Sequence, residues 1–114
     1  MSERRRQGGG DVAVEEKPQS KQRVQRPRLY RVLLHNDDFT PREFVVMILE
    51  QIFLKSESDA VSIMMHAHTT GFAVAGVYTR EIAETKVEET MHVSTEAQYP
   101  LLCTMEPDDE SGDD

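Results

Sequence analysis

A short apolar run that stops at an amide and two acids constrains this chain more than any other feature. Residues 29–34, Leu-Tyr-Arg-Val-Leu-Leu, predict a β-strand. Asn36, Asp37 and Asp38 follow closely, and Thr40-Pro41 then predicts the start of a helix. Because elements on both sides hold the backbone of such a junction, its side chains leave the fold in fixed directions. The junction is therefore the first place to look for a site.

Asn36, Asp37 and Asp38 allow two interpretations. Their oxygens are acceptors, and ionised carboxylates add negative charge, which suits a cationic group such as an amine or a metal. The same residues are also typical of an ordinary turn, in which side chains accept from nearby backbone N–H groups. The spacing lacks the glycine and the distal glutamate of a calcium-binding loop. The local sequence leaves the turn and the cation site both open.

Charge is divided unevenly along the 114 residues, a length that predicts one domain. Residues 1–28 carry eight Lys/Arg and four Asp/Glu, a net charge of +4, whereas residues 29–114 carry −12. An acidic body disfavours nucleic-acid binding and favours cationic partners.

No apolar run is long enough for a membrane span, and the N-terminus does not resemble a signal peptide. The single cysteine, Cys103, excludes an internal disulfide framework, and we expect a cytoplasmic protein.

Composition predicts three segments. Residues 1–27 contain a glycine triplet, mixed charge and few large apolar residues, so we expect a flexible N-terminal extension. Residues 28–106 form the predicted core domain. Residues 107–114 are mostly acidic and are expected to be a frayed tail.

Helix signals divide the core domain. Thr40 is expected as an N-cap with Pro41 at the first helical position and Glu43 completing a capping box. A second helix is predicted from Ser56 to about residue 70, where Gly71 is suited to a left-handed C-terminal position. A third helix is expected after residue 79, through residue 91.

Strands are predicted at residues 29–34, 72–78 and 100–105. The resulting order is strand, helix, helix, strand, helix, strand. We therefore predict a small α+β fold, with a three-stranded sheet and the helices on one face. The two-helix connection is long enough for a crossover between parallel strands.

Signs of catalysis are missing from the sequence. His66 and His68 are two positions apart, so they do not share a helix face and should not form a two-histidine metal site. There is no glycine-rich phosphate loop, no serine nucleophile elbow and no paired acid–base arrangement. We expect no enzyme, no catalytic residue, no metal and no cofactor. The rival interpretation is a metal-dependent hydrolase that uses Asp37, Asp38 and the histidines.

Four blocks of the core domain resemble the ClpS adaptor family. They cover the core domain in order: Asn36-Asp37-Asp38-Phe39-Thr40-Pro41, Met64-Met65-x-x-His68, residues 76–87 (Gly-Val-Tyr-Thr-Arg-Glu-Ile-Ala-Glu-Thr-Lys-Val) and residues 99–106 (Tyr-Pro-Leu-Leu-Cys-Thr-Met-Glu). The resemblance implies an adaptor of the bacterial N-end rule pathway. Such an adaptor binds N-degron proteins that begin with Leu, Phe, Tyr or Trp and delivers them to the ClpA–ClpP protease.

The resemblance also implies a binding site. The α-amino group of the substrate would be held by Asn36, Asp37 and His68. The pocket for the first side chain would be lined by Thr40, Met47, Met64 and Leu101, with Asp38 at its rim. Two residues depart from the family pattern: Arg42 stands where many members have Met at the pocket entrance, and His35 stands where an apolar residue is usual.

The partner implied by the resemblance is the N-terminal domain of a ClpA-type unfoldase, contacted through Glu81 and Lys86. Residues 1–27 would be engaged by the unfoldase during delivery, and the adaptor would act as a monomer. The alternative is a modulator of the ClpA unfoldase whose N-degron specificity is altered or lost. Retention of Asn36, Asp37 and His68 argues against a complete loss.

Overall fold

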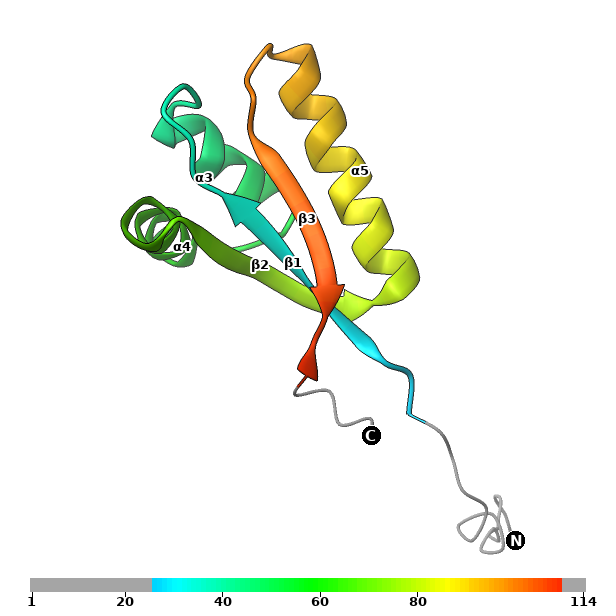
Figure 1. The fold of residues 1–114 in the computed structure, drawn as a ribbon. Helices are drawn as coiled ribbons and strands as arrows, with labels where there is room; N and C mark the ends of the chain where they lie inside the picture. The colour runs from blue at the N-terminus through cyan, green and yellow to red at the C-terminus, as the bar shows by residue number, and fades with distance from the viewer. Residues whose placement is uncertain (1–25, 110–114) are drawn as a thin grey trace, which may run out of the picture.

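Within residues 26–109, three strands and three helices follow one another in the predicted order. A computed structural model describes residues 26–109. Its elements are β1 (Leu29–His35), α3 (Arg42–Gln51), α4 (Glu57–Thr70), β2 (Phe72–Thr79), α5 (Arg80–Glu96) and β3 (Leu102–Pro107) (Figure 1). The α+β class and the β-α-α-β-α-β order are confirmed.

The sheet has the strand order β2-β1-β3, and both pairings are antiparallel. The two-helix connection is long enough for a crossover between parallel strands, but the strands that it joins are antiparallel. The two helices α3 and α4 pack against each other and bring the chain back to the end of β1, so β2 begins where β1 stops. The backbone N–H of Asn36 donates to the carbonyl of Gly71 over 2.9 Å, which closes this junction.

The start of α3 differs from the predicted capping box. The N-cap position is Pro41, whose extended backbone keeps it outside the helix, and no side chain caps the first turn. The hydroxyl of Thr40 donates to Asp37 Oδ2 over 2.8 Å instead. The Thr40 hydroxyl is therefore hydrogen-bonded to Asp37 and does not cap the helix as had been expected.

The other helix ends follow the sequence signals. Ser56 accepts from the backbone N–H of Asp59 over 3.1 Å and begins α4, and Gly71 ends it with a φ of 103°. Helix α5 begins after Thr79 and continues to Glu96, beyond the predicted end.

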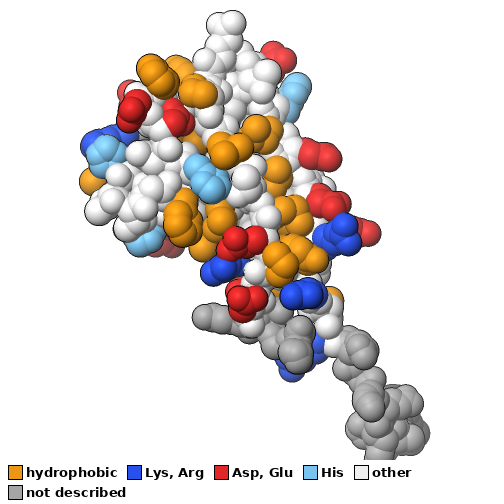
Figure 2. All heavy atoms as spheres, in the orientation of Figure 1, with side chains coloured by type: hydrophobic (Ala, Val, Ile, Leu, Met, Phe, Trp, Pro, Cys, Tyr) orange, Lys and Arg blue, Asp and Glu red, His pale blue; other side chains and the backbone are white. Residues whose placement is uncertain are grey.

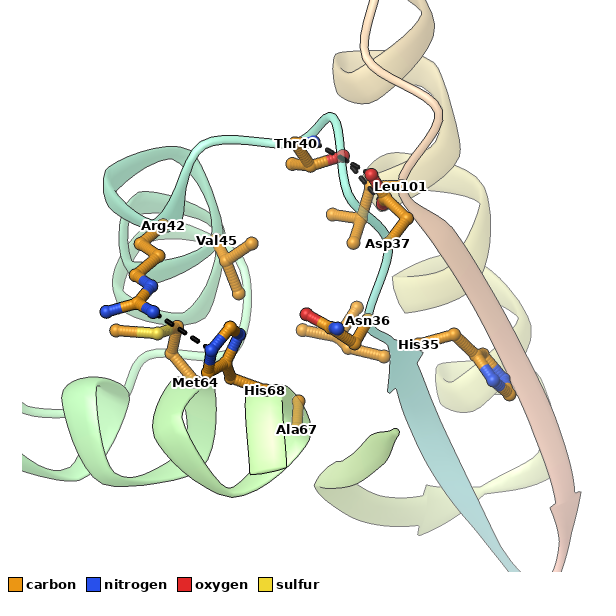
Figure 3. Close-up of a pocket in the computed structure, with 11 residues that line it drawn as sticks. His35, Asn36, Asp37, Thr40, Arg42, Val45, Met64, Ala67, His68 and Leu101 are labelled. Carbon is orange, nitrogen blue, oxygen red and sulfur yellow. Dashed lines mark hydrogen bonds between the residues drawn. The ribbon is translucent and has the colours of Figure 1, made fainter. Parts of the chain in front are cut away.

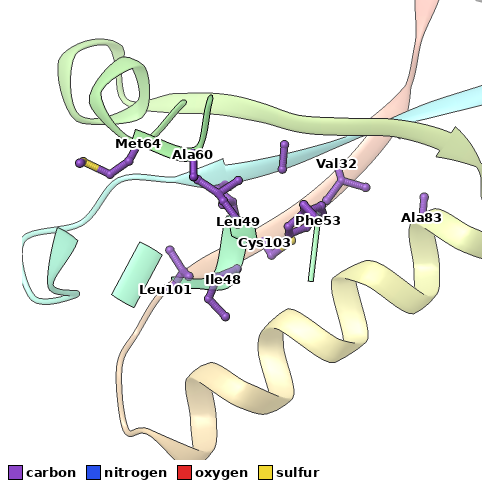
Figure 4. Close-up of a cluster of buried hydrophobic side chains, with 11 residues drawn as sticks. Val32, Ile48, Leu49, Phe53, Ala60, Met64, Ala83, Leu101 and Cys103 are labelled. Carbon is purple, nitrogen blue, oxygen red and sulfur yellow. The ribbon is translucent and has the colours of Figure 1, made fainter. Parts of the chain in front are cut away.

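The core lies between the sheet and the helices, which cover one face of the sheet (Figures 1 and 4). Val32 and Leu34 of β1 belong to it, and α3 contributes Ile48 and Leu49. Cys103 is buried in the same cluster, as its strand position predicted. On the opposite sheet face, four apolar side chains are partly exposed: Phe72, Val74, Val77 and Leu102. Hydrophobic side chains gather over the strands in Figure 2.

The predicted outer segments lie almost wholly outside the described residues. Of the N-terminal extension, only residues 26 and 27 are described. Strand β3 ends at Pro107, and the backbone N–H of Asp108 donates to Leu29 over 2.9 Å, so strand pairing reaches into the segment expected as the acidic tail. Among residues 26–109, no helix is long and apolar enough to cross a membrane.

Candidate ligand-binding site

A cavity lies where the end of β1 meets α3, α4 and the loop before β3 (Figure 3). Its polar side chains come from the β1–α3 loop, the start of α3 and the end of α4. Its lining residues are Leu34, His35, Asn36, Asp37, Thr40, Arg42, Val45, Met64, Ala67, His68 and Leu101. The junction singled out in the sequence therefore forms one wall of this cavity.

Asn36 is held by its backbone and leaves its side chain available. Its N–H donates to Gly71, which fixes the loop against the α4–β2 connection. Its side-chain amide points into the cavity (Figure 3). An amide oxygen in this place is an acceptor for a donor that enters from solvent.

Asp37 organises the loop between β1 and α3. Its Oδ1 accepts from the backbone N–H groups of Phe39 and Thr40, both over 2.8 Å. Its Oδ2 accepts from the Thr40 hydroxyl over 2.8 Å. The turn interpretation of this residue is thus correct. A carboxylate has about four lone-pair sites, so these three bonds leave about one unused.

His68 lies across the cavity from the loop, in the last turn of α4 (Figure 3). Its Nε2 is 2.9 Å from Nη2 of Arg42, the first residue of α3. Both side chains are exposed. The contact joins two helices across the cavity mouth.

The floor of the cavity is part of the hydrophobic core. Leu34, Met64 and Leu101 are buried in the core cluster and also line the cavity. The free volume inside is about 20 Å³, space for about one water molecule. Polar acceptors therefore surround a narrow opening above an apolar floor.

Most of the residues predicted for a site line this cavity together. Asn36, Asp37 and His68 do so, as do Thr40, Arg42, Met64 and Leu101. Two predicted residues are not brought into the lining. Asp38 is exposed, and Met47 packs against the core from α3.

Four lining residues were not predicted for the site: Leu34, His35, Val45 and Ala67. Val45 lies one helical turn after Arg42, and Ala67 lies one helical turn after Met64. Spacing from a predicted site residue was therefore the available signal.

His35 is explained by the sheet. Its Nε2 lies 2.8 Å from Oγ1 of Thr104 on β3, and its ring lies beside Phe72 at 6.2 Å between centroids. In Figure 3 the ring points toward β3 and away from the cavity. The polar ring of His35 at the strand end therefore makes a hydrogen bond to the neighbouring strand.

Helix α5 carries the residues expected to contact an unfoldase. Glu81 is exposed in its first turn. Lys86 is half-buried, and its Nζ donates to the Ile52 carbonyl at the end of α3 over 2.6 Å. The ammonium also lies 5.9 Å from the ring centroid of Tyr78.

The arrangement suits ligand binding. Neither serine nor cysteine is among the described lining residues, and the Thr40 hydroxyl donates to the Asp37 carboxylate. Within residues 26–109, no three His, Cys, Asp or Glu side chains are grouped so that they could hold a metal ion. Acceptors above an apolar floor suit a cationic group attached to an apolar one.

Comparison with known families agrees with this geometry. The family model described as "ATP-dependent Clp protease adaptor protein ClpS" matches residues 25–104. The chain belongs to the ClpS family. By that description, ClpS proteins are adaptors of the ATP-dependent Clp protease rather than the protease itself.

Individual ClpS proteins are similar over most of the chain. The ATP-dependent Clp protease adapter protein ClpS of Phenylobacterium zucineum is 51% identical over 109 residues, which cover 95% of this chain and all of that protein. The Myxococcus xanthus ClpS is 48% identical over 99 residues, 87% of this chain and 92% of that protein.

A solved ClpS structure has the same fold. Agrobacterium tumefaciens ClpS2 bound to L-phenylalaninamide matches with a TM-score of 0.71 and 49% identity, covering 73% of this chain and all of that one. Its ligand carries a free α-amino group next to an aromatic side chain. The neighbour is therefore a ClpS protein that holds the chemical group expected here.

Proposed function

We propose that this chain is an N-degron adaptor. It binds the free N-terminal residue of proteins that begin with Leu, Phe, Tyr or Trp and delivers them to a ClpA–ClpP protease in the cytoplasm. The observation that carries the proposal is the meeting of Asn36, Asp37 and His68 around one cavity with an apolar floor. The amine-bearing ligand of the Agrobacterium ClpS2 structure supports it.

The α-amino group would bind at the mouth. A protonated amine has three N–H donors, and the Asn36 oxygen, the Asp37 carboxylate and a neutral His68 nitrogen are three acceptors. A hydrogen bond to a charged group contributes about 1.5–3 kcal/mol, more than a neutral bond. Acetylation removes the charge and leaves one N–H, so a blocked terminus should bind far more weakly.

The first side chain would enter toward the floor. Burying a Leu or Phe side chain against Met64, Leu101 and their neighbours contributes about 1.5–3 kcal/mol. Methionine is unbranched and adaptable, which suits a pocket for both flat rings and a branched chain. A β-branched side chain would bring its extra methyl against the narrow opening beside the amine.

Delivery of the substrate to the protease would use helix α5. The N-terminal domain of a ClpA-type unfoldase is the proposed partner, with Glu81 and Lys86 of α5 as its contacts and the adaptor as a monomer. Since Glu81 is exposed, it is free to meet a cationic partner. Lys86 is already bonded within the fold, so its role in docking would depend on its aliphatic stem or on release from Ile52.

The test is a peptide series that differs only in the first residue. Fluorescence anisotropy should show binding for Phe, Leu, Tyr and Trp and at least tenfold weaker binding for Val, Ile and Ser, a difference of about 1.4 kcal/mol or more. Uniform affinity across the series would contradict the proposal. Absence of all peptide binding, with retained binding to the unfoldase, would favour the modulator alternative.

A further inference from the structure

The pair of Arg42 and His68 is the feature of the site that the proposed function does not explain. The two residues are 26 positions apart, and their side chains meet at 2.9 Å between Nη2 and Nε2. Both also line the cavity that would receive a substrate amine. A cation of the protein itself thus lies against one of the three acceptors.

The chemistry of the pair fixes which atom donates. A guanidinium has five N–H donors and no acceptor, so Nε2 of His68 must accept from Arg42. A neutral imidazole has one N–H and one acceptor nitrogen, so the proton is then on Nδ1. The only lone pair of the ring is used by Arg42.

A substrate amine needs that same lone pair. If it approached Nδ1 instead, the ring proton would have to move to Nε2, which would then place an N–H against the Arg42 N–H. Both tautomers therefore lead to the same conclusion. Arg42 and a ligand ammonium cannot bind His68 at the same time.

We propose that Arg42 is a competitive occupant of the amine site, which a substrate must displace before it binds. This inference rests on the proposed function. Because Arg42 is exposed and long, its side chain can turn to solvent without movement of the α3 backbone.

Displacement of Arg42 should lower the affinity for every substrate by the same factor and should not change which first residue is preferred. Every ligand with a free amine loses the same Arg42–His68 contact, so the cost is the same whatever its first side chain. The ratio of affinities between two first residues should not depend on Arg42, although each affinity should.

The experiment compares Arg42→Met and Arg42→Ala with the wild-type full chain, using Phe- and Leu-initiated peptides. Both variants should bind both peptides more tightly, by roughly three- to tenfold, the effect of one modest hydrogen bond. Arg80→Met is the matched control, since Arg80 is an exposed arginine on α5 that pairs with Glu84 outside the cavity. It also removes one positive charge, and it should leave the affinity within about twofold of the wild-type value.

Two outcomes would overturn the inference. Equal or weaker binding by both Arg42 variants would show that Arg42 does not compete, and equal gains in Arg80→Met would assign the effect to net charge. ¹⁵N NMR of the free wild-type protein should place the His68 proton on Nδ1, and Arg42→Ala should shift it toward Nε2; a wild-type proton on Nε2 would also overturn it. Failure of the wild-type protein to bind either peptide would instead contradict the proposed function.

Discussion

At the scale of single residues, Asp37 shows how one side chain serves both the fold and the proposed site. Its carboxylate accepts three hydrogen bonds from Phe39 and Thr40 and still lines the cavity. An alanine at this position would therefore disturb the loop as well as the charge. Asparagine separates the two effects, because its amide oxygen can still accept from the backbone of Phe39 and Thr40.

We predict that Asp37→Asn lowers the affinity for a Phe-initiated peptide by about tenfold or more, since the ion pair between the ammonium and the carboxylate becomes a hydrogen bond to an uncharged amide. The melting temperature should change little. Asp38→Asn is the matched control, because Asp38 is the neighbouring acid but is exposed and outside the cavity lining. Anisotropy titrations of both variants provide the measurement, and equal losses in the two would contradict a specific role for Asp37.

Cys103 gives a prediction on pH. Burial raises the pKa of its thiol to about 12, so the thiol should stay protonated and react slowly with Ellman's reagent at about pH 8 until the chain unfolds. The folded state favours the protonated form. Its contribution to stability is therefore complete below the ordinary thiol pKa of 9.0, which the unfolded chain would have, and is lost as the pH rises toward about 12. Rapid reaction of the folded protein would contradict this burial.

Contacts between individual side chains were harder to predict from the sequence than the helices and strands. The identities of Asn36, Asp37 and His68 followed from a family pattern, and the cavity brings all three together. The Arg42–His68 contact did not follow, because it joins residues 26 positions apart in a geometry set by helix packing. Thr40 was mistaken for a cap because the sequence does not show that Asp37 competes for its hydroxyl.

At the scale of elements, α3 and α5 are connected through Lys86. Its ammonium donates to the Ile52 carbonyl, one of the groups left without a helical partner at the end of α3. A cation at a helix C-terminus also interacts favourably with the helix dipole. Because α3 carries Arg42 and borders the cavity, this contact helps to hold the site wall.

Lys86→Met should lower the free energy of unfolding by about 1–2 kcal/mol, since it keeps the apolar stem but leaves a partly buried carbonyl without its charged donor. Urea denaturation measures the change. Lys55→Met is the control, because the Lys55 ammonium makes no hydrogen bond or ion pair with the described residues, and the variant should stay within about 0.5 kcal/mol of wild type. Equal stability of the two variants would contradict the capping role of Lys86.

Elements themselves were largely predictable. Ser56 and Gly71 mark the ends of α4 as their chemistry predicts, and the strands lie within two residues of their expected bounds. Strand direction was not predictable from connection length, because a two-helix connection permits either direction. The packing of α3 on α4, which the local sequence does not encode, returns the chain to the end of β1 and makes β2 antiparallel.

At the scale of the whole molecule, charge separates the basic N-terminal segment from the acidic body. Residues 1–28 carry +4 and the remainder −12. The cavity lies at the end of β1, and its described lining residues belong to the core domain. Substrate binding and delivery should therefore depend on different parts of the chain.

A chain that lacks residues 1–27 should bind a Phe-initiated peptide with unchanged affinity, because the residues proposed to hold the amine and the first side chain all belong to the core domain. It should fail to support degradation of a Phe-initiated reporter by ClpA–ClpP. The comparison of anisotropy with reporter loss tests both halves of this expectation. Normal degradation with the shortened chain would contradict the role proposed for the segment.

The central claim is that the cavity recognises a free α-amino group joined to a large apolar side chain. Calorimetric titration of the full chain with two peptides, identical except that one Phe terminus is free and the other acetylated, tests it most directly. We predict binding of the free peptide and at least a hundredfold weaker binding of the acetylated one, about 2.7 kcal/mol for the lost charge and donors. Equal affinity for the two peptides would contradict the claim.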